Sequence, residues 1–382
     1  MRAWASRWPG LVLGTAFVVL LGAYGYKTYL RKGGHVRELN ISCFVFRDMN
    51  RNGLYDLGDR PYSGLVVTLA RPDGSRVEAR SNLAGFTNFA MSAESKNAAV
   101  REEGSYNIEA SATAGWEITS NNEKQQTRFR FLAESPAGIV AERAFDPVGV
   151  APRLVLKGVL VGAKSLAAEN PQGIRQEIAT ATDGAFEFPA TPGPWKLFIV
   201  DSAGAAVTRT VNVGLYSTVV SCSGLGERSA PEKGLERSVD FESLTTSDTL
   251  MEVPRGYGGL DWINWVATHQ KLYEGDGFIN GTVSGEFVAY NSSGHPALIE
   301  NARGFDLRGM FVGVAWLPAE GHDVVIRAWR GEQLIHEDRF RGSTWGPLAF
   351  DADYRNITRL EVSSSAFWQV LVDDLRYRLE EM

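Results

Sequence analysis

Residues 41–69 read ISCFVFRDMNRNGLYDLGDRPYSGLVVTL. The two ends of this stretch, ISCFVF at 41–46 and LVVTL at 65–69, have the β-branched and aromatic bias of strands. Between them, residues 48–59 are rich in Asp, Asn and Gly, which are residue types that favour turns. The stretch therefore predicts a strand, a polar loop and a second strand, with no helix before the loop.

The loop at residues 48–59 carries oxygen-bearing side chains at a regular spacing. They stand at positions 1, 3, 5, 9 and 12 of the loop, with Gly53 at position 6 and the Leu54 carbonyl at position 7. A Ca²⁺ ion binds six to eight oxygens, and glycine permits the sharp turn that wraps the loop around it. The spacing predicts a calcium site, and the alternative is an ordinary polar turn without an ion. The predicted ligands are Asp48, Asn50, Asn52, Leu54, Asp56 and Asp59.

Residues 40–150 resemble the B-type domain of serine-aspartate repeat surface adhesins. The resemblance rests on the strand, on the D-x-N-x-N-G-x-x-D-x-G-[ED] loop and on the glycine-hydrophobic strand that follows. Two later segments, SNLAGFTNF at 81–89 and EGSYNIEASATAGWEITSNN at 103–122, extend it. It implies an immunoglobulin-like sandwich over residues 39–150 that calcium stiffens. In that family such domains act as stalks or spacers.

Residues 152–221 repeat the pattern of short strand-like segments and turns, with Asp183-Gly184 predicting a hairpin. The motifs T-x-T-D-G-x-F-x-F and P-G-P-W-K-L resemble carboxypeptidase-regulatory-like or collagen-adhesin B-type sandwiches. We therefore expect a second immunoglobulin-like sandwich at 152–221. Residues 222–238 are polar and rich in Gly and Ser, so they are predicted to be a linker.

Residues 239–382 open with VDFESL and close with QVLVDDLRYRL near the C-terminus. This stretch resembles an exported galactose-binding-like jelly roll, which implies a fold more than a function. The first and last strands of such a roll lie side by side, so carboxylates from both strands could share a cation. We expect Glu242 and Asp374 to form a second calcium site, with ordinary strand-end carboxylates as the alternative. Because side chains alternate along a strand, Asp373 and Asp374 point to opposite faces.

Aromatic residues of this last stretch give a different prediction, because an aromatic ring can stack on the apolar face of a sugar. A glycan-binding platform is one interpretation of these rings. The alternative is that they pack in the core, as most large aromatics do. The candidate platform residues are Tyr257, Trp262, Trp265 and Trp345.

Residues 8–26 contain no charged residue and are centred on LVLGTAFVVLL. As a helix this segment would be about 28 Å long, close to the roughly 30 Å thickness of bilayer hydrocarbon. The small residues Ala23 and Gly25 form a small-x-small site that favours cleavage of a signal peptide, whereas the basic residues that follow favour a retained membrane anchor. In either case we expect the remaining chain to face the periplasm or the cell exterior. We expect an anchor, with secretion after signal cleavage as the alternative.

The sequence contains two cysteines, Cys43 and Cys222. Two cysteines do not make a structural zinc site, which usually takes four ligands. They are interpreted either as two unpaired thiols or as a disulfide between domains, which an extracytoplasmic location permits.

The formal net charge of −6 argues against a nucleic-acid partner. The sequence has no nucleophile elbow, no His-Glu-x-x-His and no phosphate-binding loop, so no enzymatic activity is predicted. We expect an all-β protein: two immunoglobulin-like sandwiches and a jelly roll behind one N-terminal helix. The expected function is that of a membrane-tethered structural or adhesion protein, whose partner is a glycan or a surface protein. The alternatives are a carbohydrate-binding surface protein or, less in keeping with the motifs, a hydrolase.

Overall fold

The computed structural model describes residues 38–160, 162–221, 234–244, 250–273 and 276–380. It is 55% strand and 4% helix, which confirms the all-β prediction. The chain divides into two compact units, Met1–Ala151 and Pro152–Met382, which we call the N-terminal unit and the C-terminal unit. The hydrophobic segment at 8–26 lies outside the described residues. No helix among the residues described is long and apolar enough to cross a membrane.

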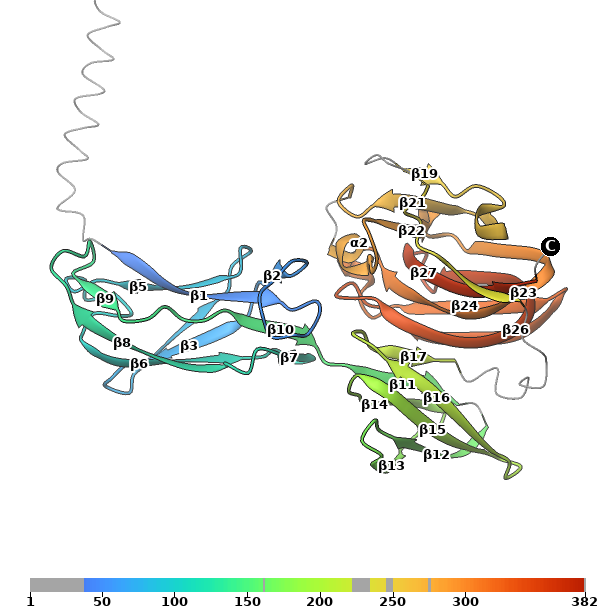
Figure 1. The fold of residues 1–382 in the computed structure, drawn as a ribbon, viewed down its shortest axis with the longest axis horizontal. Helices are drawn as coiled ribbons and strands as arrows, with labels where there is room; N and C mark the ends of the chain where they lie inside the picture. The colour runs from blue at the N-terminus through green and yellow to red at the C-terminus, as the bar shows by residue number, and fades with distance from the viewer. Residues whose placement is uncertain (1–37, 161, 222–233, 245–249, 274–275, 381–382) are drawn as a thin grey trace, which may run out of the picture. The chain divides into compact units, whose positions relative to one another are not determined.

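The N-terminal unit is a sandwich of two five-stranded sheets (Figure 1). One sheet has the order β2-β1-β10-β7, with β5 also paired to β1, and the other has the order β4-β3-β6-β8-β9. Buried and exposed residues alternate along β5 and β8, because successive side chains of a strand point to opposite faces. The strands are β1 (Leu39–Arg47), β2 (Arg60–Pro61), β3 (Val66–Ala70), β4 (Arg76–Arg80), β5 (Phe86–Met91), β6 (Gly104–Ser111), β7 (Trp116–Ile118), β8 (Lys124–Phe131), β9 (Ile139–Ala141) and β10 (Val148–Pro152).

The C-terminal unit begins with residues 152–221, which we call the middle lobe. Its four-stranded sheet has the order β13-β12-β15-β16, and β14, β11 and β17 form a second layer. The turn at Asp183-Gly184 leads to β14, which pairs with β11 and not with β13. The predicted hairpin at this turn is therefore wrong, because the chain changes sheet there. The strands are β11 (Val155–Val159), β12 (Ala163–Glu169), β13 (Arg175–Ile178), β14 (Ala185–Pro189), β15 (Gly193–Asp201), β16 (Ala206–Val213) and β17 (Thr218–Val220).

Residues 234–380, which we call the head, form the rest of the C-terminal unit. Strand β23 pairs with β26 along both of its halves; its N-terminal half also pairs with β20, and its C-terminal half also pairs with β27. Register shifts bend these long strands, so each contributes to both layers around one large core. The elements are β18 (Leu235–Val239), β19 (Met251–Glu252), β20 (Asp261–Ile263), β21 (Trp265–His269), α2 (Asp276–Gly281), β22 (Phe287–Asn291), β23 (Ala297–Val314), β24 (Asp323–Arg330), β25 (Gln333–Arg341), β26 (Leu348–Ser364) and β27 (Val370–Leu379), with short 3₁₀ turns at Tyr257–Gly259, Ser292–Gly294 and Leu317–Ala319.

The predicted linker at 222–238 is shorter than expected at its C-terminal end. Residues 235–239 form β18, which pairs with β27 in register from Leu235 opposite Leu379 to Val239 opposite Leu375. This strand was assigned to the linker because its sequence is polar, and all but its last residue are exposed. The first and last strands of the head therefore lie side by side, but Glu242, which was expected on the first strand, lies in the turn that follows β18.

One short strand joins the middle lobe to the head. Strand β17 pairs in parallel with β11 of the middle lobe and in parallel with β26 of the head, so that both lobes share one sheet. Adjacent residues of β17 point to opposite faces. Val219 packs into the core of the head, whereas Val220 packs into the core of the middle lobe. The two stretches predicted as separate domains are continuous at this strand.

Candidate functional site

The carboxylate loop, residues 48–59, follows β1 in the N-terminal unit. Its first residue is anchored, because the Asp48 backbone N–H donates to the Val150 carbonyl at 2.9 Å and only 2% of Asp48 is exposed. The Asp48 carboxylate accepts the backbone N–H of Asn52 at 3.2 Å and that of Gly53 at 2.8 Å. This carboxylate therefore folds the first half of the loop back on itself.

The second half of the loop converges on Asp56. The side-chain amide of Asn50 donates to the two Asp56 carboxylate oxygens at 3.0 and 3.2 Å, and the amide of Asn52 donates to Oδ2 at 2.6 Å. Asp59 closes the ring, since it accepts the backbone N–H of Met49 at 2.8 Å and that of Asp56 at 3.0 Å. The loop thus brings together the five side chains that were predicted as ligands.

The electrostatics of the loop favour a positive charge. Burial raises the pKa of the Asp59 carboxyl above its usual value, and the neighbouring negative charges of Asp48 and Asp56 raise it further. Hydrogen bonds from the backbone of Asp56 and Met49 oppose this rise in pKa. A cation at this point would relieve the repulsion between the three carboxylates.

Carboxylates alone do not make a metal site in this loop. In the described ranges no group of three or more His, Cys, Asp or Glu side chains is placed to hold a metal ion. An ion would need the amide oxygens of Asn50 and Asn52 and the Leu54 carbonyl as well. The side-chain oxygens of Asn50 and Asn52 accept the backbone N–H groups of Asn52 at 3.0 Å and of Leu54 at 2.8 Å, so both amides would have to rotate before their oxygens faced Asp56. With both amides rotated, every donor would be an oxygen, which is the ligand type that Ca²⁺ takes.

The predicted second site, at Glu242 and Asp374, lies around residues 283–287. Oε1 of Glu242 accepts the backbone N–H groups of Glu286 at 2.8 Å and Phe287 at 2.7 Å. Oδ1 of Asp374 accepts the Ser284 hydroxyl at 2.7 Å. Both carboxylates therefore hold the same short segment in place. This is a structural task that needs no ion, and a second ion stays a prediction.

Asp373 is the buried member of the Asp373-Asp374 pair. It is fully buried, and its Oδ2 accepts the backbone N–H groups of Val283 at 2.7 Å and Ser284 at 3.2 Å. Burial raises the pKa of Asp373 to about 7, against the lowering effect of these hydrogen bonds. The two side chains do not point to opposite faces as predicted, because both carboxylates bond to Ser284 and a register shift interrupts the alternation of β27 at this point.

Two of the four predicted sugar-binding aromatics are core residues. Trp265 is fully buried and Trp262 is 3% exposed, and both belong to the core of the head. Their indole N–H groups donate to backbone carbonyls, of Leu298 at 3.0 Å and of Tyr257 at 2.9 Å. The predicted platform is wrong for these two residues, because no sugar can reach their faces. Tyr257 is half-buried against the same core, and Trp345 is 40% exposed on the segment between β25 and β26.

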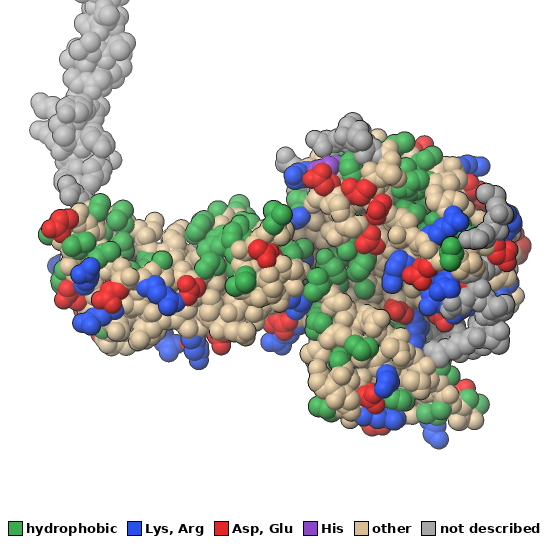
Figure 2. Space-filling view, viewed as in Figure 1, with side chains coloured by type: hydrophobic (Ala, Val, Ile, Leu, Met, Phe, Trp, Pro, Cys, Tyr) green, Lys and Arg blue, Asp and Glu red, His purple; other side chains and the backbone are tan. Residues whose placement is uncertain are grey.

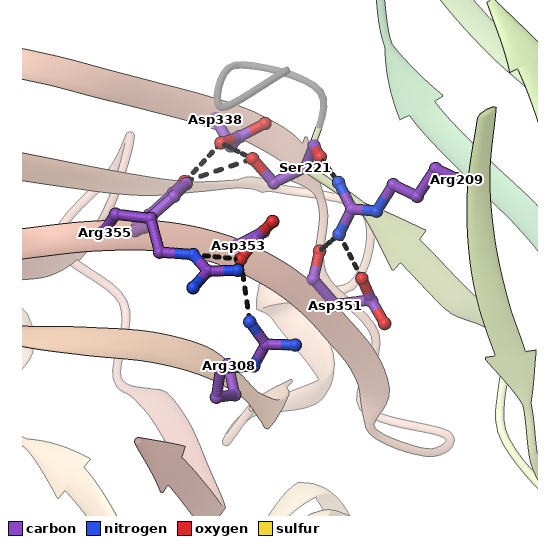
Figure 3. Close-up of polar contacts among 8 residues, drawn as sticks. Arg209, Ser221, Arg308, Asp338, Asp351, Asp353 and Arg355 are labelled. Carbon is purple, nitrogen blue, oxygen red and sulfur yellow. Dashed lines mark hydrogen bonds and ion pairs between the residues drawn. The ribbon is translucent and has the colours of Figure 1, made fainter. Parts of the chain in front are cut away.

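The junction between the middle lobe and the head contains a buried ion pair. The guanidinium of Arg209, on β16, reaches across β17 to the carboxylate and the backbone carbonyl of Asp351 on β26 (Figure 3). It also donates to the Ser221 carbonyl at the end of β17. Only 6% of Arg209 is exposed. A single arginine on the four-stranded sheet of the middle lobe therefore bonds to the end of β17 and to β26 in the sheet that both lobes share.

A second polar group lies beside this ion pair. The Ser221 hydroxyl donates to Oδ2 of Asp338 at 2.6 Å, and the hydroxyl of buried Tyr354 donates to the same oxygen (Figure 3). On the neighbouring positions of β26, Asp353 accepts from Arg308 and Arg355, each at 2.7 Å. Sequence reasoning missed this network, because its members are scattered between residues 209 and 355 and form no local motif.

Cys43 lies in the core of the N-terminal unit. It is a free, fully buried thiol, and burial, with a smaller contribution from Asp146, raises its pKa to about 12. Its sulfur lies 3.7 Å from the Asp146 carbonyl oxygen. Cys222, the other half of the predicted disulfide alternative, lies outside the described residues.

No protein-family model matches the sequence, and no curated protein is significantly similar to it. Among solved structures, BcpA, the major pilin subunit of Bacillus cereus, is 9% identical, with a TM-score of 0.20 over 83% of this chain and 99% of that chain. GBS52, a minor pilin of Streptococcus agalactiae, is 12% identical, with a TM-score of 0.19 over 48% of this chain and 93% of that one. The Bacillus anthracis TIE protein is 13% identical, with a TM-score of 0.21 over 48% of this chain, which spans 33% of its length. These similarities are too low to carry a functional argument.

Proposed function

We propose that this chain is a non-enzymatic structural or adhesion protein of the cell surface whose N-terminal unit is a spacer stiffened by calcium. The observation that carries the proposal is the convergence of Asn50 and Asn52 on the Asp56 carboxylate, inside a loop that Asp48 and Asp59 close. Calcium is millimolar outside the cytoplasm, and extracellular calcium modules bind with dissociation constants of about 10⁻⁴ to 10⁻³ M. A loop of this donor set suits that environment.

The loop is placed where an ion would stiffen the sandwich. It follows β1 directly, and β1 pairs with β2, β5 and β10. Gly53 packs so closely on the Thr119 carbonyl that an added Cβ would lie 2.9 Å from that oxygen. An ion in the loop would therefore fix the connection between β1 and β2 against the turn that follows β7. The uncharged segment at 8–26 supports a membrane tether for such a spacer.

The proposal is tested by thermal unfolding of the full chain in 10 mM CaCl₂ and in EGTA. At 10 to 100 times the dissociation constant, calcium would stabilise the folded N-terminal unit by about 1.4–2.7 kcal/mol. For a unit of this size we expect its melting temperature to rise by about 5–15 °C. The variants Asp48→Ala and Asp56→Asn should abolish the rise. Asp56→Asn keeps the size of an exposed side chain, so it is expected to fold even if the variant at the buried Asp48 does not.

Asp73→Ala is the matched control. Asp73 is an exposed aspartate of the same unit that also accepts a backbone N–H, that of Ser75 at 2.8 Å. This variant should keep the full calcium response. An unchanged melting temperature of the wild type in calcium would overturn the proposal. Isothermal titration calorimetry of the same protein counts the bound ions.

A further inference from the structure

A groove of about 410 Å³ lies between the middle lobe and the head. One wall is the loop between β16 and β17, and the other wall is the outer surface of four strands of the head, β18, β23, β26 and β27. Its volume falls within the roughly 300–1,000 Å³ typical of small-molecule sites. It is lined by Asn212, Gly214, Leu215, Tyr216, Ser238, Phe311, Ala349, Asp374 and Arg376.

Strand register explains why the residues of the head face the groove. Ser238 stands opposite Arg376, and Phe311 stands opposite Ala349, so the members of each pair lie on the same face of the sheet. Between Asp373 and Arg376 the register shifts, because β27 there has one residue more than β23. This bulge, at which Asp374 has a φ of +45°, frees its side chain from the alternation that would direct it to the core.

The bulge has a conformational cost, although Asp374 there also accepts the Ser284 hydroxyl. A non-glycine residue in the left-handed region costs about 1–3 kcal/mol, and such residues cluster at functional sites. The strained residue is an aspartate that lines the groove. Gly309, on the neighbouring strand, is required by the backbone, since an added Cβ there would overlap the Phe350 carbonyl oxygen; the Arg376 guanidinium lies 3.0 Å from the same position. Asp374 and Arg376 both line the groove.

The chemistry of the groove is that of a site for a ligand with many hydroxyl groups. Tyr216 and Phe311 are in edge contact, with ring centroids 5.4 Å apart and planes at 70°, so the groove offers an aromatic surface. Around it stand a carboxylate, a guanidinium, an amide and a hydroxyl. The side chains of Asn212, Ser238 and Arg376 make no hydrogen bond to other residues that the structure describes, and Asp374 uses one oxygen, on Ser284. Donors and acceptors are therefore both available.

The charges of the groove cancel, because Asp374 and Arg376 are the only charged residues in the part of its lining that the structure describes. A net neutral ligand with an apolar face and a ring of hydroxyls matches this arrangement, whereas an anion would meet Asp374. We propose that the groove binds a neutral pyranose residue of a glycan. The aromatic pair would contact the apolar face of the sugar, and Asp374 and Arg376 would bind its hydroxyls. This names a ligand class for the proposed adhesion role and does not depend on calcium.

Neither lobe could form this groove alone. Tyr216 and Asn212 come from the middle lobe, whereas the two charged residues come from the head. Strand β17 sets the distance between the two walls of the groove, because it bonds the middle lobe to the head. The Ala349 N–H donates to the Ser217 carbonyl at 2.9 Å, and Thr218 pairs with Ala349. The junction therefore assembles the groove before any ligand arrives, which lowers the entropic cost of binding.

The test is saturation-transfer NMR on the full chain in detergent, with the methyl pyranosides of galactose, glucose, mannose and N-acetylglucosamine as probes. Methyl glucuronide is included as a charged probe. We expect transfer to at least one neutral pyranoside, and an affinity at least tenfold lower in Tyr216→Ala and in Arg376→Gln. Arg376 is exposed, so Arg376→Gln should fold even if the aromatic variant does not. The affinity should be the same in calcium and in EGTA, which separates this proposal from the calcium spacer.

Phe367→Ala is the matched control, because Phe367 is an exposed aromatic of the head outside the groove. Binding should be unchanged in this variant. Three outcomes would overturn the proposal: no transfer to any neutral pyranoside, preference for the glucuronide, or binding that survives both groove variants.

Discussion

The carboxylate loop and the junction between the middle lobe and the head are both polar, but they are built in opposite ways. In the loop, side-chain hydrogen bonds join residues two to ten positions apart, as in Asn50 with Asn52 and Met49 with Asp59. At the junction, Arg209 bonds to Asp351, 142 positions away, and Ser221 bonds to Asp338, 117 positions away. The loop organises a short piece of chain, whereas the junction holds two lobes together.

The two regions also differ in what surrounds their charges. Several polar groups of the loop are exposed, so water competes with their hydrogen bonds and each is worth little. The junction places a guanidinium in a nearly dry environment, where loss of one partner leaves a buried charge uncompensated. We conclude that the junction is a rigid scaffold, and that the loop is a place where an added ion can change stability.

Removal of the junction arginine should have the largest effect. In Arg209→Ala, Asp351 and the Ser221 carbonyl lose their common donor, which should destabilise the C-terminal unit by about 3 kcal/mol. Differential scanning calorimetry of the full chain measures this, with the transition of the N-terminal unit as internal reference. The control is Lys196→Ala, which removes an exposed ion pair to Glu169 and should cost less than about 1 kcal/mol. Equal losses in the two variants would contradict a buried clamp.

The strand shared by both lobes gives the second prediction. Val219 and Val220 are adjacent, and each packs into a different core. If the shared sheet makes the lobes one cooperative unit, Val219→Ala and Val220→Ala should shift the same calorimetric transition, by about 2 kcal/mol each. Two separate transitions, each sensitive to only one of the variants, would show that the lobes unfold independently.

The same contrast explains what could be predicted from the sequence. The strand at 41–46 and the loop at 48–59 were predicted because the β-branched bias and the spacing of oxygens are local patterns. Strand β17 has only three residues, too few to show a periodic pattern in the sequence. It joins the two lobes by pairing with β26, which lies more than a hundred residues later in the chain. No local pattern records such a pairing.

Burial of single aromatics was equally beyond local reasoning. The local sequence around Trp262 and Trp265, DWINW, does not decide between surface and core, and strands from distant parts of the chain cover both rings. The groove residues Tyr216 and Arg376 drew no attention for the same reason, because they stand 160 positions apart and meet only through the junction. Long-range packing could not be predicted here, because contacts between segments far apart in the chain depend on how the intervening chain closes and not on a local residue pattern.

The smallest expected effect is that of an alanine substitution in the carboxylate loop, which tests how strongly the loop is attached to the sandwich. Gly53 and Gly74 both have positive φ, +77° and +83°, so alanine at either position meets the strain of the left-handed region, about 1 kcal/mol. Only at Gly53 would the new Cβ also meet backbone, the Thr119 carbonyl oxygen at 2.9 Å, whereas nothing lies within 4 Å at Gly74.

Gly53→Ala should therefore destabilise the N-terminal unit by about 1 kcal/mol more than Gly74→Ala, measured by urea unfolding in EGTA. If the loop binds calcium, the difference in stability between the two variants should increase when the ion is added. A bound ion would hold the loop against the turn at Thr119, so the loop could no longer shift to relieve the contact with the new Cβ. Identical losses in the two variants, with and without calcium, would mean that the loop moves away from the sandwich at little cost. In that case the loop would be attached to the sandwich no more firmly than an ordinary surface turn. The loop and the junction would then differ in stability by more than their hydrogen bonds imply.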